Sequence, residues 1–223
     1  IILEELSRMG NPASMVMGAH DLGILPLLYW GTEEQKQKYL VPLASGKAIG
    51  CGAVTDPAGL NNYPEWGLTV TEDGDDYVIN GTKVLVTNAH AADIKVVFGK
   101  PAGSYFDTVY IVEKGMPGVE TGFNERKIVP GNADWGTVTL KNVRVPKANR
   151  VVDKGFGQTW FGPSFLSICL SAMVLGETAF QKTMAFCKQR TRYERPLVDL
   201  QAVSHRLVNM AINNEISRNM IYN

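Results

Sequence analysis

The side chains that most often bind metals or form disulfides are few in this sequence and lie far apart. It contains three cysteines and three histidines, and none of them shows the short spacing of a zinc site. An odd number of cysteines argues against a disulfide framework, so we expect free thiols in a reducing compartment, either the cytoplasm or the mitochondrial matrix. These residues are Cys51, Cys169, Cys187, His20, His90 and His205. The sequence therefore predicts no metal site.

The composition is that of an ordinary soluble globular chain. Of the 223 residues, 45% are hydrophobic and 20% are charged, which excludes general disorder. The 22 Lys and Arg residues balance the 22 Asp and Glu residues, so the formal net charge is zero. Proteins that bind nucleic acid usually carry a basic surplus, because their cations must displace counterions from the phosphates. We therefore expect no nucleic-acid partner.

We expect no membrane span within this sequence. The longest apolar stretch, residues 165–175, contains two serines and is much shorter than the roughly 20 residues of a spanning helix. Both ends of the sequence have a helical pattern: Ile1 follows no initiator Met, and Asn223 follows no Gly or Pro that would end a helix. We interpret the sequence as an internal piece of a longer polypeptide.

Residues 1–47 are predicted to be helical. Their apolar residues recur at three-residue spacing until the Gly-Asn-Pro sequence of residues 10–12 interrupts the pattern. Thr32 followed by Gln35 has the form of a capping box, which predicts the start of a further short helix.

Residues 48–150 are predicted to form a β domain. Short runs of strand-forming residues alternate with turn residues, and Asn80-Gly81 is the strongest hairpin signal among them. Lys141-Asn142 predicts a further turn. The expected strands are residues 68–72, 77–79, 84–86, 94–98, 108–112, 137–140 and 143–145. Such a set predicts an antiparallel barrel or sandwich.

Residues 151–223 return to a helical pattern. A long, mostly apolar helix is expected at residues 160–188, and apolar residues recur at three- and four-residue intervals between Leu200 and Met210. Arg195-Pro196 separates the two helices, which predicts an antiparallel helical hairpin. The expected fold is α+β, with N-terminal helices, a central antiparallel β barrel or sandwich and a C-terminal helical bundle.

Four short motifs, in order along the chain, resemble those of the acyl-CoA dehydrogenase family. The first contains Gly-Thr-Glu-Glu-Gln and Pro-Leu-Ala-Ser-Gly, and the second is Val-Thr-Asp-Pro-Ala-Gly. The third contains Asn-Gly-Thr-Lys and Val-Thr-Asn-Ala, and the fourth contains Tyr-Glu-Arg-Pro-Leu. They occupy residues 31–46, 54–59, 80–93 and 190–203. The resemblance covers essentially the whole chain.

The resemblance implies an FAD-dependent enzyme that introduces a 2,3 double bond into an acyl-CoA thioester. In the family a Glu carboxylate removes the α-proton, the β-hydride passes to the flavin, and the electrons leave through an electron-transfer flavoprotein. An α C–H next to a thioester is a weak acid until the carbonyl is polarised, so the protein must place flavin, thioester and base together. The resemblance also implies an oligomer, a dimer of dimers.

The resemblance assigns two groups of residues to the cofactor. One group lies in the β domain, and the other reaches across a dimer interface to the flavin of the partner subunit. They are Val54, Thr55, Gly59, Val86 and Thr87 in the first group, and Arg190, Arg192, Tyr193 and Gln201 in the second. The planar guanidinium group suits phosphate, which it binds with two hydrogen bonds.

Each of these residues also has a structural interpretation. Thr55 can cap the turn at Asp56-Pro57, Thr87 can lie on an exposed strand face, and Gly59 can be an ordinary turn glycine. The arginines can form a solvated helix end, where positive charge is favourable. Gln201 can be a surface residue of its helix. The sequence leaves both sets of interpretations open.

The sequence departs from the family at several positions. Leu60 replaces a serine that contacts phosphate and substrate, and Leu85 replaces a tryptophan that packs on the flavin. Ser164 and Phe165 stand where many members have Thr and Arg near the acyl-CoA. We therefore assign Leu60, Ser164 and Phe165 to the substrate side of the site.

We nominate no catalytic residue. Some branches of the family place the catalytic Glu at the position of Ser164, and others place it in a region that would follow Asn223. Glu177 and Glu215 are the nearby helical carboxylates, and we interpret them as solvated.

Three functional hypotheses remain. The chain is an active dehydrogenase with an unusual pocket, a flavin-incomplete paralogous subunit of a heteromeric dehydrogenase, or an interaction module without this activity. The sequence does not identify the acyl group.

Overall fold

The computed structural model describes residues 1–8, 13–60, 62–99, 108–123, 133–152 and 156–223. The predicted helix break at residues 10–12 lies outside them. Contacts divide the chain into two units, which we call the helical unit (residues 1–14 and 165–223) and the β unit (residues 15–164). Each unit is described by itself.

The β unit begins with helices. They are α2 (Ala13–Trp30), α3 (Glu33–Gln35), the π-helical turn η1 (Lys36–Leu40) and α4 (Val41–Ala44). The predicted capping box is confirmed, because Thr32 Oγ1 accepts from the main-chain N–H of Gln35 at 3.2 Å and Gln35 Oε1 accepts from that of Thr32 at 3.0 Å. The Gln35 amide also donates to the carbonyl oxygens of Ala148 and Arg150, at 2.7 and 2.9 Å. The start of α3 is thereby joined to the end of the β domain.

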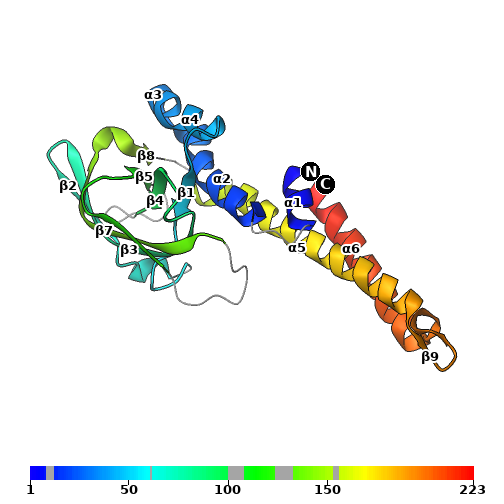
Figure 1. Ribbon diagram of the computed structural model, residues 1–223. Helices are drawn as coiled ribbons and strands as arrows, with labels where there is room; N and C mark the ends of the chain where they lie inside the picture. The colour runs from blue at the N-terminus through cyan, green and yellow to red at the C-terminus, as the bar shows by residue number, and fades with distance from the viewer. Residues whose placement is uncertain (9–12, 61, 100–107, 124–132, 153–155) are drawn as a thin grey trace. The chain divides into compact units, whose positions relative to one another are not determined.

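Two four-stranded sheets follow (Figure 1). The first has the order β1-β4-β5-β8, with strands Gly50–Ala53, Ile94–Phe98, Thr108–Glu113 and Arg150–Val152. The second has the order β2-β3-β7-β6, with strands Thr69–Asp73, Asp76–Thr87, Trp135–Pro146 and Val119–Phe123. Short 3₁₀ turns lie at η2 (Tyr63–Glu65) and η3 (Lys147–Asn149). The arrangement is a β sandwich, as predicted, except that β1 pairs with β4 in parallel.

Apolar residues fill two layers of the β unit. One cluster joins the inner faces of the two sheets and includes Ile79, Tyr110 and Leu140. The other covers the opposite face of the first sheet, where Leu27 of α2 and Leu43 of α4 pack against that sheet's strands. Strand β4 is therefore buried along its whole length, including Lys95, whose ammonium donates to the Ala92 carbonyl oxygen at 2.6 Å.

Two predicted turns are wrong, because the chain runs through both of them as strand. Strand β3 passes through Asn80-Gly81, and β7 passes through Lys141-Asn142. The register shifts between Ile79 and Gly81, and Asn80 Oδ1 accepts from the main-chain N–H of Asn142 at 2.7 Å. Gly81 and Asn142 both have positive φ. Residues that favour positive φ occur in β-bulges as well as in hairpin turns, so the sequence pattern fits either structure.

The helical unit contains α1 (Ile2–Arg8), most of α5 (Phe156–Gln189) and α6 (Gln201–Tyr222). Between α5 and α6 lie the two-residue strands β9 (Thr191–Arg192) and β10 (Arg195–Pro196), followed by the 3₁₀ turn η4 (Leu197–Asp199). Figure 1 shows α5 and α6 side by side, which confirms the predicted helical hairpin.

Helix α5 is more apolar than the sequence analysis indicated. Within the described residues, the segment Gly162–Gln189 is long and apolar enough to cross a membrane by length and composition, and 11% of its most apolar window is buried. Core helices of soluble proteins pass the same test, so this finding is weak evidence for a span. The absence of a membrane span stays a prediction.

Candidate functional site

The first predicted cofactor segment follows strand β1. Val54 is buried in the apolar cluster beneath the helices, and Thr55 is half-buried. The carbonyl oxygen of Thr55 accepts from the main-chain N–H of Val84 at 2.8 Å. This bond brings Val54 and Thr55 beside the end of β3, where Val86 and Thr87 lie. The structure thus brings together residues that are about thirty positions apart in the sequence.

The loop after Thr55 is closed by Asp56 rather than by the threonine. Asp56 Oδ1 accepts from the main-chain N–H groups of Ala58 and Gly67 at 3.4 and 3.2 Å. The main-chain carbonyl oxygen of Asp56 accepts from the main-chain N–H of Gly59 at 2.8 Å. Gly59 has φ +101°, a conformation that a residue with a side chain rarely adopts. No described atom lies within 4 Å of the position that a Cβ on Gly59 would take. The backbone there is open to a ligand, and Gly59 is also needed for the turn.

Leu60 packs against the apolar cluster that contains Val54. A serine at this position would offer a hydroxyl group, which Leu60 cannot. The loop therefore gains apolar contact where the family pattern predicts a hydrogen-bond donor.

Sequence reasoning missed a buried ion pair beneath this loop. The Lys83 ammonium lies 3.7 Å from Asp56 Oδ2, and the two side chains are 0% and 3% exposed. The Lys83 Nζ atom also lies 3.6 Å from the centroid of the Trp66 ring, and the Trp66 indole N–H donates to the Gly59 carbonyl oxygen at 3.0 Å. Burial lowers the pKa of Lys83 to about 8, although the charge of Asp56 opposes this shift.

The last residues of β3 are irregular. A register shift between Lys83 and Val86 leaves Leu85 at φ +57° with 52% of its surface exposed. Val86 returns to the buried face, and Thr87 is half-buried and pairs with Trp135 of β7. The Trp135 indole N–H donates to the Leu85 carbonyl oxygen at 2.6 Å. Both the structural interpretation of Thr87, a partly exposed strand face, and the cofactor interpretation fit this position.

A hydrogen-bonded corner follows Thr87. Asp134 Oδ1 lies 2.6 Å from His90 Nδ1, and its Oδ2 accepts from the main-chain N–H groups of His90 and Ala91. Burial acts to raise the pKa of Asp134, but the hydrogen bonds from Ala91 and His90 outweigh it, so that the pKa lies below its ordinary value. The Asn88 amide donates to the carbonyl oxygens of Val16 and Gly50. The end of β3 is therefore firmly held by its neighbours.

The second predicted group lies at the tip of the helical hairpin. Arg190, Arg192 and Tyr193 are exposed, with Tyr193 at 74%, and Gln201 is the exposed first residue of α6. Tyr193 and Glu194 both have positive φ, which makes the tight turn between β9 and β10. The Arg192 guanidinium carbon lies 5.3 Å from the centroid of the Tyr193 ring. These four residues belong to the helical unit and form a group of their own.

The predicted substrate residues on α5 lie where the two units meet in sequence. Ser164 is half-buried, and Phe165 is 52% exposed. Their role in substrate binding stays a prediction.

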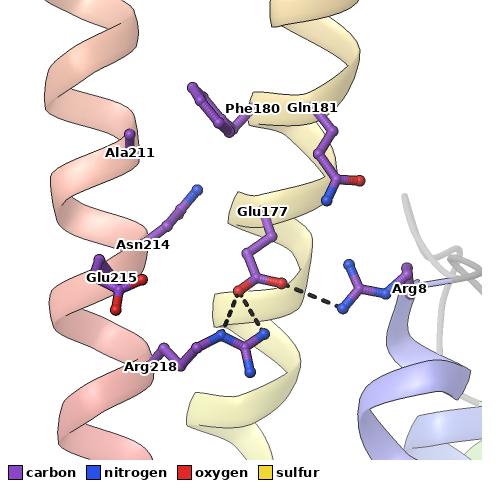
Figure 2. A pocket seen from close by; sticks show the side chains of 8 residues that line it. All are labelled: Arg8, Glu177, Phe180, Gln181, Ala211, Asn214, Glu215 and Arg218. Atoms are coloured by element: carbon purple, nitrogen blue, oxygen red, sulfur yellow. Dashed lines mark hydrogen bonds and ion pairs between the residues drawn. The ribbon is translucent and has the colours of Figure 1, made fainter.

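The helical unit also contains an open pocket of about 610 Å³, lined by polar and apolar side chains (Figure 2). Figure 2 shows Glu177 of α5 between two arginines: it accepts from Arg218 at 2.6 and 2.9 Å and from Arg8 at 3.3 Å. Arg218 also donates to Glu4, and hydrogen bonds from Arg218 and Tyr222 lower the pKa of Glu4. The interpretation of Glu177 as a solvated carboxylate is wrong, because its side chain is 15% exposed and is paired. Both carboxylate oxygens of Glu177 are therefore already engaged by arginines.

Within the described residues, no group of three or more His, Cys, Asp or Glu side chains could hold a metal ion. Cys51, Cys169 and Cys187 are free thiols. Burial raises the pKa of Cys51 to about 12, so this thiol is unreactive at neutral pH.

Comparison with known proteins identifies the family of this chain. Residues 1–47, 51–143 and 158–223 match the models of the acyl-CoA dehydrogenase N-terminal, middle and C-terminal domains. An acyl-CoA dehydrogenase of Bacillus subtilis is 31% identical over the whole chain, and a short-chain specific acyl-CoA dehydrogenase of Clostridium acetobutylicum is 33% identical. The chain covers 61% of each of these relatives.

Solved structures agree. The butyryl-CoA dehydrogenase of Megasphaera elsdenii superposes with a TM-score of 0.88 at 28% identity, over 99% of this chain and 60% of that one. The chain thus spans about three fifths of the length of the relatives that it matches. Since the three domain models together match most of its residues, the chain belongs to the acyl-CoA dehydrogenase family.

Proposed function

We propose that the protein is an FAD-dependent dehydrogenase that introduces a 2,3 double bond into an acyl-CoA thioester. The observation that carries the proposal is the hydrogen bond between the Thr55 carbonyl oxygen and the Val84 N–H. It places two segments with family motifs at one edge of the β unit, where both Thr55 and Thr87 are half-buried. A solved relative from Bacillus anthracis, 28% identical, is described as complexed with FAD.

The residues at this edge fit a flavin. The edge offers two threonine hydroxyls, the main-chain groups of the two valines that precede them and open backbone at Gly59. Arg190 and Arg192 are exposed and suit the pyrophosphate of a cofactor held by a partner subunit. The residues that would hold FAD are Val54, Thr55, Gly59, Val86, Thr87, Arg190, Arg192, Tyr193 and Gln201. FAD, when bound, accepts the β-hydride of the substrate.

The residues of this chain would bind the cofactor and the substrate and orient them. The hydroxyl groups of Thr55 and Thr87 would orient the ring, and the loop at Leu60 would exclude water from the β-unit side of the site. We place the base that removes the α-proton outside this segment, because the relatives are longer than this chain. Glu177 is already paired with Arg8 and Arg218, so we do not assign it this role.

We further propose an electron-transfer flavoprotein as the electron acceptor and a dimer of dimers as the assembly. One relative, 29% identical, is the CarC subunit of a caffeyl-CoA reductase–Etf complex in Acetobacterium woodii. The exposed arm from Arg190 to Gln201 suits an assembly in which one subunit completes the site of another. Free thiols, two of them buried and one exposed, suit a reducing compartment, the cytoplasm or the mitochondrial matrix.

The second candidate is a flavin-incomplete subunit of a heteromeric dehydrogenase. It is favoured by Leu60, which packs into the apolar cluster where a hydrogen-bond donor is expected.

Absorbance spectroscopy of the purified protein tests both candidates. The proposed function predicts a flavin spectrum that bleaches when a suitable acyl-CoA is added without oxygen. A series of acyl groups, from short straight chains to branched and aromatic ones, identifies the substrate. A folded protein that stays colourless alone and gains flavin only with a homologous subunit would favour the second candidate. A folded protein that binds no flavin under either condition would exclude both.

A further inference from the structure

The outer face of the second sheet has an aromatic residue that the family motifs do not assign. Trp135 is the first residue of β7 and lies directly opposite Thr87 in the register. Cross-strand partners project from the same face of a sheet, so the indole and the Thr87 hydroxyl share one side. Val86 and Val138, on the opposite side, are buried in the inter-sheet cluster. Trp135 itself is only half-buried.

The orientation of the Trp135 ring is fixed by Leu85. The indole N–H donates to the Leu85 carbonyl oxygen at 2.6 Å, across the bulge where Leu85 adopts φ +57°. An indole has a single hydrogen-bond donor, so this bond uses the N–H group of the ring. A positive φ is energetically costly for a leucine residue. The bulge and the hydrogen bond from the indole together hold Leu85 in this backbone conformation.

The backbone of β7 at this point is also held. The main-chain N–H of Asn88 donates to the Asp134 carbonyl oxygen at 2.8 Å, and the Asp134 carboxylate binds the turn at His90. A Cβ at Gly136 would lie 2.5 Å from the Gly122 carbonyl oxygen and 2.6 Å from His90 Cε1. Residues on either side of Trp135 are therefore closely packed, and the indole is placed by a rigid frame.

We propose that Trp135 supplies the aromatic surface that contacts the flavin ring system, in place of a ring at Leu85. The inference rests on the proposed function, which places a planar heteroaromatic cofactor beside Thr87. Leu85 is exposed but offers no ring, whereas the neighbouring strand brings an indole to the same end of the sheet. Offset aromatic stacking stabilises a pair of rings beyond the area that it buries, and an aliphatic side chain does not reproduce it.

Equilibrium FAD binding by the purified protein tests this, with the variants Trp135→Leu and Trp135→Phe. Loss of the ring in Trp135→Leu is expected to raise the dissociation constant by about three- to tenfold. Trp135→Phe keeps a ring but loses the bond to Leu85, and it is expected to change the constant less than about twofold. Trp30→Phe, at the end of α2, is the matched control and should bind FAD as the wild type does.

A second readout follows the tryptophans directly. If Trp135 contacts the flavin, adding FAD quenches tryptophan emission in the wild type, and most of this quenching is lost in Trp135→Phe but retained in Trp30→Phe. Thermal unfolding of each apoprotein shows whether a variant is folded.

The outcomes separate the two proposals. If the wild type binds FAD and folded Trp135→Leu binds it equally well, the role of Trp135 is excluded and the proposed function stands. If Trp135→Phe weakens binding as much as Trp135→Leu, the bond to Leu85 matters and stacking does not. If the folded wild type binds no FAD, alone or with a homologous subunit, both proposals fail.

Discussion

In the β unit the predicted cofactor residues lie among buried groups and main-chain hydrogen bonds, whereas in the helical unit they are exposed at the tip of a hairpin. The Thr55 carbonyl bonds to Val84, and the loop that follows is anchored on the buried pair Asp56–Lys83. Arg190 and Arg192 have no comparable burial. The first region can be ordered before any ligand arrives, and the second gains contacts when a partner and its ligand are present. Substitutions of the buried groups that anchor the first region should therefore change stability, and substitutions of the exposed arginines in the second should change binding.

The largest expected effect is on the buried pair. Lys83→Met leaves the Asp56 carboxylate buried without its cation, and we expect the free energy of unfolding to fall by about 3 kcal/mol. Chemical denaturation measures the change. The double variant Lys83→Met/Asp56→Asn removes both charges and should recover most of the loss. If the double variant is no more stable than Lys83→Met, the ion pair does not anchor the loop.

The same lysine gives a pH dependence with a defined sign. Its pKa is lowered from 10.5 to about 8 in the folded protein, so between these values the unfolded chain binds more protons than the folded one. The contribution of Lys83 to the free energy of unfolding therefore rises with pH from about 8 to 10.5, by at most about 1.4 kcal/mol per pH unit. The free energy of unfolding of the wild type and of Lys83→Met, measured as a function of pH over this range, isolates the contribution of Lys83, because the two proteins share their other titrating groups. Parallel curves would contradict the assignment.

In the helical unit we expect the opposite response. Arg190→Ala should weaken FAD retention in the oligomer by about tenfold, as the loss of a charge-assisted hydrogen bond predicts, while the free energy of unfolding changes by less than about 0.5 kcal/mol. Gel filtration followed by flavin absorbance measures retention. Lys182→Ala removes another exposed cation from α5 and serves as the control. Equal retention in the two variants would make Arg190 an ordinary surface cation.

The smallest expected effect is that of removing the Thr87 hydroxyl at the end of β3. Thr87→Val keeps the shape of the side chain and removes its hydroxyl, so we expect the rate of flavin reduction by substrate to fall about three- to tenfold, with stability changed by less than about 1 kcal/mol. Stopped-flow absorbance measures the rate. Thr71→Val, on the exposed strand β2, is the control. An unchanged rate in Thr87→Val would remove the residue from the site.

Much of the fold could be predicted from the sequence, and the two wrong turns share one cause. Asn-Gly and Lys-Asn favour positive φ, which serves a hairpin turn and a bulge equally well. At Gly81 the choice is made by tertiary contact, since a Cβ there would lie 2.6 Å from Leu68 Cα. Such a contact joins distant parts of the chain and has no local signal. Other strands, including β4 and β5, were still predicted from their short runs of strand-forming residues.

The candidate site was predicted only where motif order could indicate it. Thr55 and Thr87 were assigned from the motifs, whereas Lys83 lies within a motif but was given no role, and Trp135 lies outside the motifs. A lysine is usually exposed, and the bulges on either side of Lys83 disturb the alternation that would place it inward. Trp135 becomes relevant through its register with Thr87, which depends on strand pairing across almost fifty residues of chain.

The side chain of Gln35 has a consequence for the order of folding during synthesis. It bonds to the carbonyl oxygens of Ala148 and Arg150, which lie 113 and 115 positions later in the chain. These acceptors leave the ribosome long after the helix that begins at Glu33, at a synthesis rate of roughly 5–20 residues per second. The hydrogen bonds of Gln35 that join these helices to the end of the β domain can therefore form only after the chain has been translated beyond Arg150, several seconds later.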